Sequence, residues 1–432
     1  MKTFEPKLFT TFKNNSYKAK DLVSDLVAGL IVAIIALPLS IALAIASGAT
    51  PETGLYTAII AGFVISALGG SRVNISGPTA AFATIVAGII ASEGMEGLML
   101  ATIMAGILLV ILGLCRVGSL IKFIPHTITV GFTAGIAVTL VIGQLKDFLG
   151  LTYPAGTNAI ETIDKLVLVF ENIKTINWWS VLVGVIGLAI LIFWPKVSKK
   201  IPGSLIAVLV GALVVGLLSL SVNTIGTLYT LKSGLPSFHL PTVTFDKIIS
   251  LLPSAITIAL LAGIESLLSC VVSDGMINDK HNSNTELIAQ GVGNLCVGFM
   301  GGIPATGAIA RTAANVRNGG RSPIAGMTHA VVLLLVLVVL IPYASLIPMP
   351  IIAAILFIVA YNMSEWREFV HILKTSKWWD ILVLVLTFAL TVIFDLVKAI
   401  AVGMVVHYVI FFIMKKVNKN KTEKQPNQAQ EN

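Results

Sequence analysis

The sequence from Gly301 to Asn315 reads GGIPATGAIARTAAN and lies within a strongly apolar chain. Its glycines and Pro304 disfavour a continuous helix, and Arg311 places a full charge inside it. Backbone that leaves helical geometry within a bilayer must line a cavity or be covered by protein, because lipid cannot bond free N–H groups. A helix that begins there directs unpaired N–H donors and its positive dipole end into the cavity. The stretch predicts half of an anion-binding site; a kinked ordinary span with Arg311 reaching the membrane surface is the alternative.

A second stretch of the same character runs from Gly69 to Thr84 and reads GGSRVNISGPTAAFAT. It also begins with a glycine pair, and Pro78 suits the first turn of a helix, where a missing N–H is no loss. The two glycine pairs lie about half a chain apart, which indicates an internal duplication. Paired broken segments in corresponding halves point to the binding site of a transporter.

The composition is that of a membrane protein. Of 432 residues, 56% are hydrophobic and 12% are charged, and the mean hydropathy is +0.93; soluble domains carry about 25% charged residues. We expect an all-α polytopic protein with fourteen transmembrane segments in a seven-plus-seven inverted repeat. Two segments that are too short for a full span, 78–92 and 306–318, are predicted half-helices. The predicted segments are 25–46, 54–69, 78–92, 97–115, 125–145, 178–195, 203–221, 250–273, 286–300, 306–318, 322–342, 346–362, 379–394 and 396–414.

The positive charges predict the orientation. The net charge is +8, and most of the 29 Lys and Arg residues fall on one side of the predicted segments. By the positive-inside rule that side is cytoplasmic. It includes a basic arm, 1–20, and a polar tail, 415–432, which we expect to be disordered. The chain is thus expected to be a multi-pass protein of the inner or plasma membrane with both termini in the cytoplasm. In this setting the positive charge does not indicate nucleic-acid binding.

The sequence offers no enzyme chemistry. Cys115, Cys270 and Cys296 lie in or beside apolar runs, and their spacing fits neither a disulfide framework nor a metal site. We find no nucleophile–base pair and no phosphate-binding loop. We therefore predict no catalytic residues, no metal and no cofactor.

Glu265 is the acid set deep inside a predicted span, about 22 Å along the helix from Ser250 at 1.5 Å per residue. An intramembrane carboxylate is costly and usually marks an ion pathway. Burial favours its neutral form, so Glu265 is a candidate proton carrier. Ser269 lies one turn further along and could contact a ligand. The alternative is a structural Glu265 that pairs with Arg311 and holds two helices together.

Five polar residues on the two predicted half-helices are candidate ligands, and a packing role is the alternative for each. They are Thr79, Thr84, Thr306, Thr312 and Asn315.

Three motifs resemble those of the SulP anion permease family. They are Gly69–Phe82, with GGSR followed by SGPTAAF, then Glu265–Ser269 with ESLLS, and then Gly301–Asn315. The runs Asp274–Met276 and Ser283–Leu287 are similar to the family as well. The resemblance covers residues 20 to about 415.

The resemblance implies a core domain and a gate domain, an elevator-type cycle, and an anion held between the third and tenth segments. The core comprises 21–145 and 250–342, and the gate, which begins near 120, comprises 120–249 and 343–414. The implied coupling residue is Glu265, for a proton or sodium. The expected partners are a small inorganic or carboxylate anion, the lipid bilayer and a second copy of the chain in a homodimer. The implied substrate-binding residues are Thr79, Ala80, Ala81, Phe82, Ser269, Thr306, Gly307, Ala308 and Arg311.

Two features depart from the family pattern. Most members carry a cytoplasmic STAS domain after the last span, and we expect none here. The first span reads Pro38-Leu39-Ser40 where many members have Pro-Gln, and this is similar to C4-dicarboxylate and bicarbonate transporters. We expect a secondary active transporter of the sulfate or bicarbonate class, coupled to protons in symport. The alternatives are a C4-dicarboxylate:proton symporter, a sodium:bicarbonate symporter, an anion exchanger and a nucleobase permease.

Overall fold

The structure is a computed structural model, and it describes residues 4–13, 17–118, 125–154, 157, 159, 161–198, 201–231, 234–394 and 396–424. The chain forms two compact units. The first contains residues 1–121 and 140–359, and the second contains residues 122–139 and 360–432. The predicted start of the gate near 120 falls at 119–124, outside the described residues. The division into core and gate stays a prediction.

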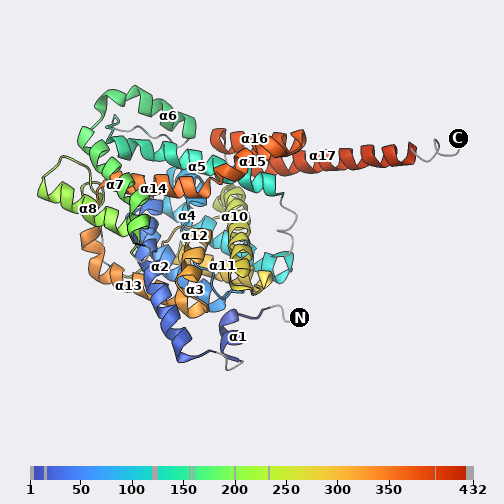
Figure 1. Cartoon of the computed structure of the whole chain (residues 1–432), viewed down its shortest axis with the longest axis horizontal. Coiled ribbons are helices and arrows are strands. Elements are labelled where there is room, and N and C mark those ends of the chain that lie inside the picture. The colour runs from blue at the N-terminus through green and yellow to red at the C-terminus, as the bar shows by residue number, and fades with distance from the viewer. Residues whose placement is uncertain are drawn as a thin grey trace. The chain divides into compact units, whose positions relative to one another are not determined.

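Helices dominate both units (Figure 1). The helices of the first unit are α1 (Lys7–Lys13), α2 (Ala19–Ala46), α3 (Pro51–Leu68), η1 (Ala80–Phe82), α4 (Ala83–Leu114), α6 (Thr162–Glu171), η3 (Ile173–Thr175), α7 (Trp178–Val197), α8 (Gly203–Leu217), α9 (Ile225–Leu228), α10 (Phe245–Ile277), α11 (Ser283–Phe299), α12 (Ile309–Arg317), α13 (Pro323–Ala344) and, for most of its length, α14 (Met349–Met363). Those of the second unit are α15 (Trp366–Thr375), α16 (Trp378–Ile393) and α17 (Leu396–Lys424), and α5 (His126–Leu149) begins there.

Each of the fourteen predicted segments contains a helix, and the predicted helical membrane fold is confirmed. Seven helices are long and apolar enough to cross a membrane, and the described part of the chain has further short apolar helices, such as 203–217 and 378–393. The count of fourteen spans stays a prediction. Beyond the last predicted span the expectation was wrong: residues 415–424 continue α17 as a helix, whereas disorder was predicted there. The rest of the tail, 425–432, lies outside the described residues.

The first unit has one small sheet that the all-α prediction missed. β1 (Ser76–Gly77) and β2 (Thr306–Gly307) pair in antiparallel register, Ser76 with Gly307 and Gly77 with Thr306. The backbone N–H of Ala308 adds a 2.9 Å bond to the carbonyl of Ile75. Two stretches from opposite halves of the sequence are therefore joined by backbone hydrogen bonds.

The two broken helices start later than predicted: β2 occupies the first two residues of the predicted segment 306–318, and after β1 the α-helix begins only at Ala83. After β1 the chain forms the short η1 and then α4, which is interrupted at Gly94 with φ of 69°. After β2 comes α12, only nine residues long. Residues preceding a proline favour extended backbone, which suits Gly77 before Pro78 and Ile303 before Pro304. Both helices therefore begin next to the sheet.

Small residues let the helices around the sheet approach closely. α4 packs along α11, where a Cβ on Gly106 would lie 2.8 Å from the carbonyl oxygen of Gly291. Close packing of small residues is a main source of helix association in membranes. α3 packs against β1, α10 packs against β2, and α13 packs along α3.

The second unit is held by a similar contact. Gly131 and Gly135 on α5 face Leu384, Thr387 and Thr391 on α16. α16 and α17 pack against each other.

Candidate anion site

The β1–β2 pair brings together the starts of η1 and α12. Thr79 directly precedes η1, and Ala308 directly precedes α12. The first N–H groups of each helix are free of intrahelical partners. The sheet thus places two sets of backbone donors from the two sequence repeats in one region.

Arg311 lies in the first turn of α12 and is 2% exposed. Its Nη2 donates to the carbonyl of Pro78, across the sheet. Nε and Nη1 have no hydrogen-bond partner among the residues that the structure describes. A Cβ on Gly77 would lie 2.6 Å from Nη1, so the glycine of β1 makes room for the guanidinium. Buried charged donors without partners are rare and costly, and two of them on one side chain indicate room for an acceptor.

Glu265 lies in α10 and is half-buried. Its Oε2 accepts a 3.1 Å hydrogen bond from the hydroxyl of Thr79. The ion pairs among the described residues do not include one between Glu265 and Arg311. The structure thus places the acid at the start of η1 rather than in a locked pair with the arginine.

Thr306 and Gly307 fasten β2 to α10. The Thr306 hydroxyl donates to the carbonyl of Ala262 at 3.0 Å and lies 2.8 Å from the hydroxyl of Ser266. The backbone N–H of Gly307 donates to the same Ser266 hydroxyl at 2.9 Å. The hydroxyl of Thr306 is therefore occupied by α10, and this favours its structural role over direct ligation.

Ser269 and Thr312 point to a common partner that the sequence did not single out, Asn74. The Ser269 hydroxyl donates to Oδ1 of Asn74 at 2.8 Å, and the Thr312 hydroxyl lies 3.1 Å from the same oxygen. Asn315 donates to the carbonyl of Val73 at 2.9 Å. Three of the predicted ligand residues therefore contact the loop before β1.

Apolar side chains cover the rest of the start of η1. Ala80, Ala81 and Phe82 are all buried, Phe82 completely. An apolar wall lowers the local dielectric and so strengthens the interaction between Arg311 and an anion. Among the described residues no group of three or more His, Cys, Asp and Glu side chains could hold a metal ion.

The sequence analysis singled out Glu265 as the acid inside a span, but the structure buries two further acids. Glu286 on α11 and Asp25 on α2 are both 0% exposed. Asp25 accepts from the Tyr17 hydroxyl at 2.6 Å and from the backbone N–H of Arg321 at 2.7 Å. The burial of these acids could not be predicted from the sequence. Both lie near helix ends, and hydropathy alone cannot tell a covered helix end from an exposed one. His329 on α13 is also completely buried.

A model of the sulfate permease family matches residues 22–387. The chain belongs to the sulfate permease family. It is 46% identical over 369 residues to "Putative sulfate transporter YvdB" of Bacillus subtilis, covering 85% of this chain and 69% of that protein. It is 32% identical over 370 residues to the "Bicarbonate transporter BicA" of Synechocystis, covering 83% and 63%. The chain thus spans about two thirds of the length of these relatives, and their names confirm the predicted class of transporter rather than enzyme.

Solved structures support the same conclusion. The transmembrane domain of a cyanobacterial bicarbonate transporter BicA matches with a TM-score of 0.80 and 31% identity, over 89% of this chain and 98% of that one. SLC26A9 matches with a TM-score of 0.84 over 94% of this chain and 68% of that one. At 20% identity, this structural match shows a shared fold alone. The sulfate permease fold is thus established for this chain.

Proposed function

We propose that this chain is a secondary active transporter of a small oxyanion, and that the anion binds between the starts of η1 and α12. One observation carries the proposal: Arg311 is buried against the β1–β2 sheet with Nε and Nη1 unpartnered among the described residues. A guanidinium with two free donors suits the paired oxygens of a carboxylate-like or sulfate-like anion. Two helix starts supply further N–H donors and a favourable dipole.

The substrate class follows from the size of this donor set. Neutral nucleobases need carboxylate or amide partners for their ring edges, whereas α12 carries a cation. Sulfate and bicarbonate rank first, and relatives named for each of them match this chain. C4-dicarboxylates rank second, because a second carboxylate would need another cation near Arg311.

Coupling is assigned to Glu265, through symport with a proton. An anion at Thr79 would meet the negative charge of Glu265, which accepts from the same hydroxyl. Protonation removes this repulsion, so that anion and proton enter together. Sodium at Glu265 would neutralise the charge as well and is the alternative. The site would move by an elevator-type cycle of a core against a gate, in a homodimer of the inner or plasma membrane.

The test is uptake of labelled sulfate, bicarbonate, succinate and uracil into proteoliposomes, with and without a pH or sodium gradient. Arg311→Gln should abolish uptake of the transported anion. Arg317→Gln is the matched control, since Arg317 is an exposed residue in the last turn of the same helix. Wild-type levels of anion uptake in Arg311→Gln, or uptake of uracil alone, would contradict the proposed site.

A further inference from the structure

We infer that Asn74 and Glu286 form a positioning pair that sets the spacing of the loop before β1, α10 and α12 around the anion. Neither residue is among the predicted ligands, and the inference rests on the proposed function. Asn74 is 6% exposed and Glu286 is 0% exposed.

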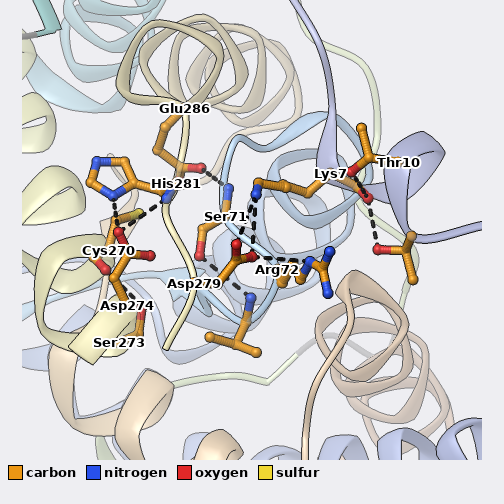
Figure 2. A network of polar contacts seen from close by, with 12 residues as sticks. Lys7, Thr10, Ser71, Arg72, Cys270, Ser273, Asp274, Asp279, His281 and Glu286 are labelled. Carbon is orange, nitrogen blue, oxygen red and sulfur yellow. Dashed lines mark hydrogen bonds and ion pairs between the residues drawn. The ribbon is translucent and has the colours of Figure 1, made fainter. Parts of the chain in front are cut away.

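Glu286 is a buried carboxylate that is held by amides alone. Its Oε2 accepts from the backbone N–H groups of Gly70 and Ser71 at 2.9 and 3.2 Å, and Figure 2 shows the second bond. Its Oε1 accepts from Nδ2 of Asn74 at 2.7 Å and from Nε2 of Gln290 at 3.0 Å. No ion pair to Glu286 occurs among the described residues. Hydrogen bonds to a buried charge are stronger than neutral ones, and losing one leaves the charge uncompensated.

The carboxylate fixes the direction of the Asn74 amide. Because Glu286 can only accept when ionised, the NH2 group of Asn74 must face it, and Oδ1 must point the other way. There Oδ1 meets the hydroxyls of Ser269 on α10 and Thr312 on α12, at 2.8 and 3.1 Å. One side chain therefore joins three segments that carry the site.

The surrounding glycines show how closely these segments approach. A Cβ on Gly307 would lie 2.7 Å from Nδ2 of Asn74, and one on Gly70 would lie 2.1 Å from the carbonyl oxygen of Asn282. The backbone N–H of Asn282 in turn donates to the carbonyl of Gly70 at 2.9 Å. The pair thus sits in a packed junction that leaves little freedom for adjustment.

The residues bonded to Asn74 lie close in the chain to Arg311 and Glu265, the two charged residues of the proposed site. Thr312 follows Arg311 in the chain, and Ser269 lies one turn from Glu265 on α10. A shift of the Asn74 amide would therefore move the guanidinium relative to the acid. Small displacements of binding groups weaken transport by large factors, since each contact depends on distance and angle.

The first test variant is Asn74→Asp, which keeps the shape and the Oδ1 acceptor but replaces the donor toward Glu286 by a second carboxylate. Two carboxylates at this distance share a proton at low pH, and they repel each other once both are ionised at high pH. The thiol of Cys270 on α10 interacts electrostatically with Glu286, and also with Asp274 on the same helix. Asp274 is already bonded to His281 at 2.7 Å.

We expect uptake by Asn74→Asp to be close to that of the wild type at about pH 5. At about pH 8 we expect it to be lower by about tenfold or more. The double variant Asn74→Asp/Glu286→Gln restores one donor and one acceptor and should recover uptake at high pH, while Glu286→Gln alone should not. Asn318→Asp is the control, because Asn318 is half-buried at the end of α12.

The outcomes separate the inference from the proposed function. A wild type that takes up none of the four solutes contradicts the proposed function, and the inference with it. A transporting wild type whose Asn74→Asp variant keeps the same affinity and pH profile overturns the inference alone. If Asn74→Asp fails to fold at neutral pH, the double variant decides: folding and uptake support the pair, and loss of both at every pH contradicts it.

Discussion

The hydroxyl of Thr79 donates a 3.1 Å hydrogen bond to Oε2 of Glu265, and so joins the residue before η1 to the middle of α10. The same hydroxyl belongs to the residue that directly precedes the first N–H groups of η1. An anion that enters there competes with Glu265 for it. This competition is the simplest physical link between the acid and the anion.

The first prediction removes that hydroxyl. Thr79→Val keeps the shape of the side chain but leaves Oε2 of Glu265 without its donor. We expect the KM for the anion to rise by about tenfold or more, because a hydrogen bond to a charged group contributes about 1.5–3 kcal/mol. Concentration-dependent uptake measures it, with Thr102→Val as the control, because the hydroxyl of Thr102 donates to the carbonyl of Leu98 within α4. An unchanged KM in Thr79→Val would show that the hydroxyl does not contribute to anion binding.

The second prediction concerns stability. Gly307→Ala places a methyl group 2.7 Å from Nδ2 of Asn74 and 3.1 Å from Cα of Ser266. Forcing atoms into a packed junction destabilises by about 1–3 kcal/mol. A lower unfolding temperature in detergent should therefore accompany loss of uptake.

Gly88→Ala on α4 is the control for this change, because no other atom lies within 4 Å of its Cβ position. Alanine there should stabilise the helix by up to about 1 kcal/mol. A Gly307→Ala protein as stable as the Gly88→Ala protein would mean that β2 can move away from Asn74.

The fold was predictable from the sequence because its signals are local. Apolar runs, and the glycine and proline residues at 69–78 and 301–307, indicated the helices and the two breaks. Arg311 and Glu265 stood out because charges are rare in apolar segments. The motifs of residues 69–82 and 301–315 then placed the chain in its family.

The β1–β2 pair and the Asn74 junction could not be predicted in this way. Two-residue strands have no periodicity, and their pairing depends on contacts across more than two hundred residues. Asn74 and Glu286 look like ordinary loop and helix-start residues, since polar side chains are common at both positions. The expectation that Thr306 ligates the anion stays untested, but its hydroxyl is occupied by Ser266 and Ala262.

The third prediction concerns the N-terminal arm, which a cluster of charges holds to the loops at 69–72 and 278–285. Oδ2 of Asp279 forms ion pairs with Nζ of Lys7 at 3.2 Å and with Nε of Arg72 at 3.0 Å (Figure 2). Burial raises the pKa of the Asp279 carboxyl, but the backbone N–H of Lys280 and the ammonium of Lys7 lower it by more, so that it lies below its usual value. A lowered folded-state pKa means that the contact stabilises docking above about pH 4 and is lost as the pH falls below that value.

We therefore expect amide hydrogen exchange in α1, corrected for the intrinsic rate, to be constant from about pH 5 to pH 7 and to rise below about pH 4. Asp279→Asn should raise exchange in α1 by a few-fold at every pH, because part-exposed ion pairs contribute at most about 1 kcal/mol. Lys20→Ala, at an exposed lysine, is the control. Exchange in Asp279→Asn that matches the wild type would show that other contacts hold the arm.

The last prediction concerns Glu265 and coupling. Accumulation against a gradient requires a group whose charge changes as the site opens to each side. Glu265→Gln resembles the protonated acid, and its amide can still accept from Thr79. It should bind the anion at least as tightly as the wild type and should exchange internal for external anion. It should lose pH-driven accumulation, since no proton can be carried.

The size of the effect is set by the gradient. One pH unit corresponds to about 1.4 kcal/mol, which supports about tenfold accumulation of a monovalent anion carried with one proton. We expect wild-type proteoliposomes with an inward proton gradient to approach this ratio and Glu265→Gln to remain near equality. Glu93→Gln, at an exposed acid of α4, should behave as wild type. If Glu265→Gln still concentrates the anion, the coupling role is wrong. If only a sodium gradient drives uptake by the wild type, Glu265 acts as an oxygen ligand for sodium. The sodium ion would then supply the positive charge that protonation supplies in the proposed cycle.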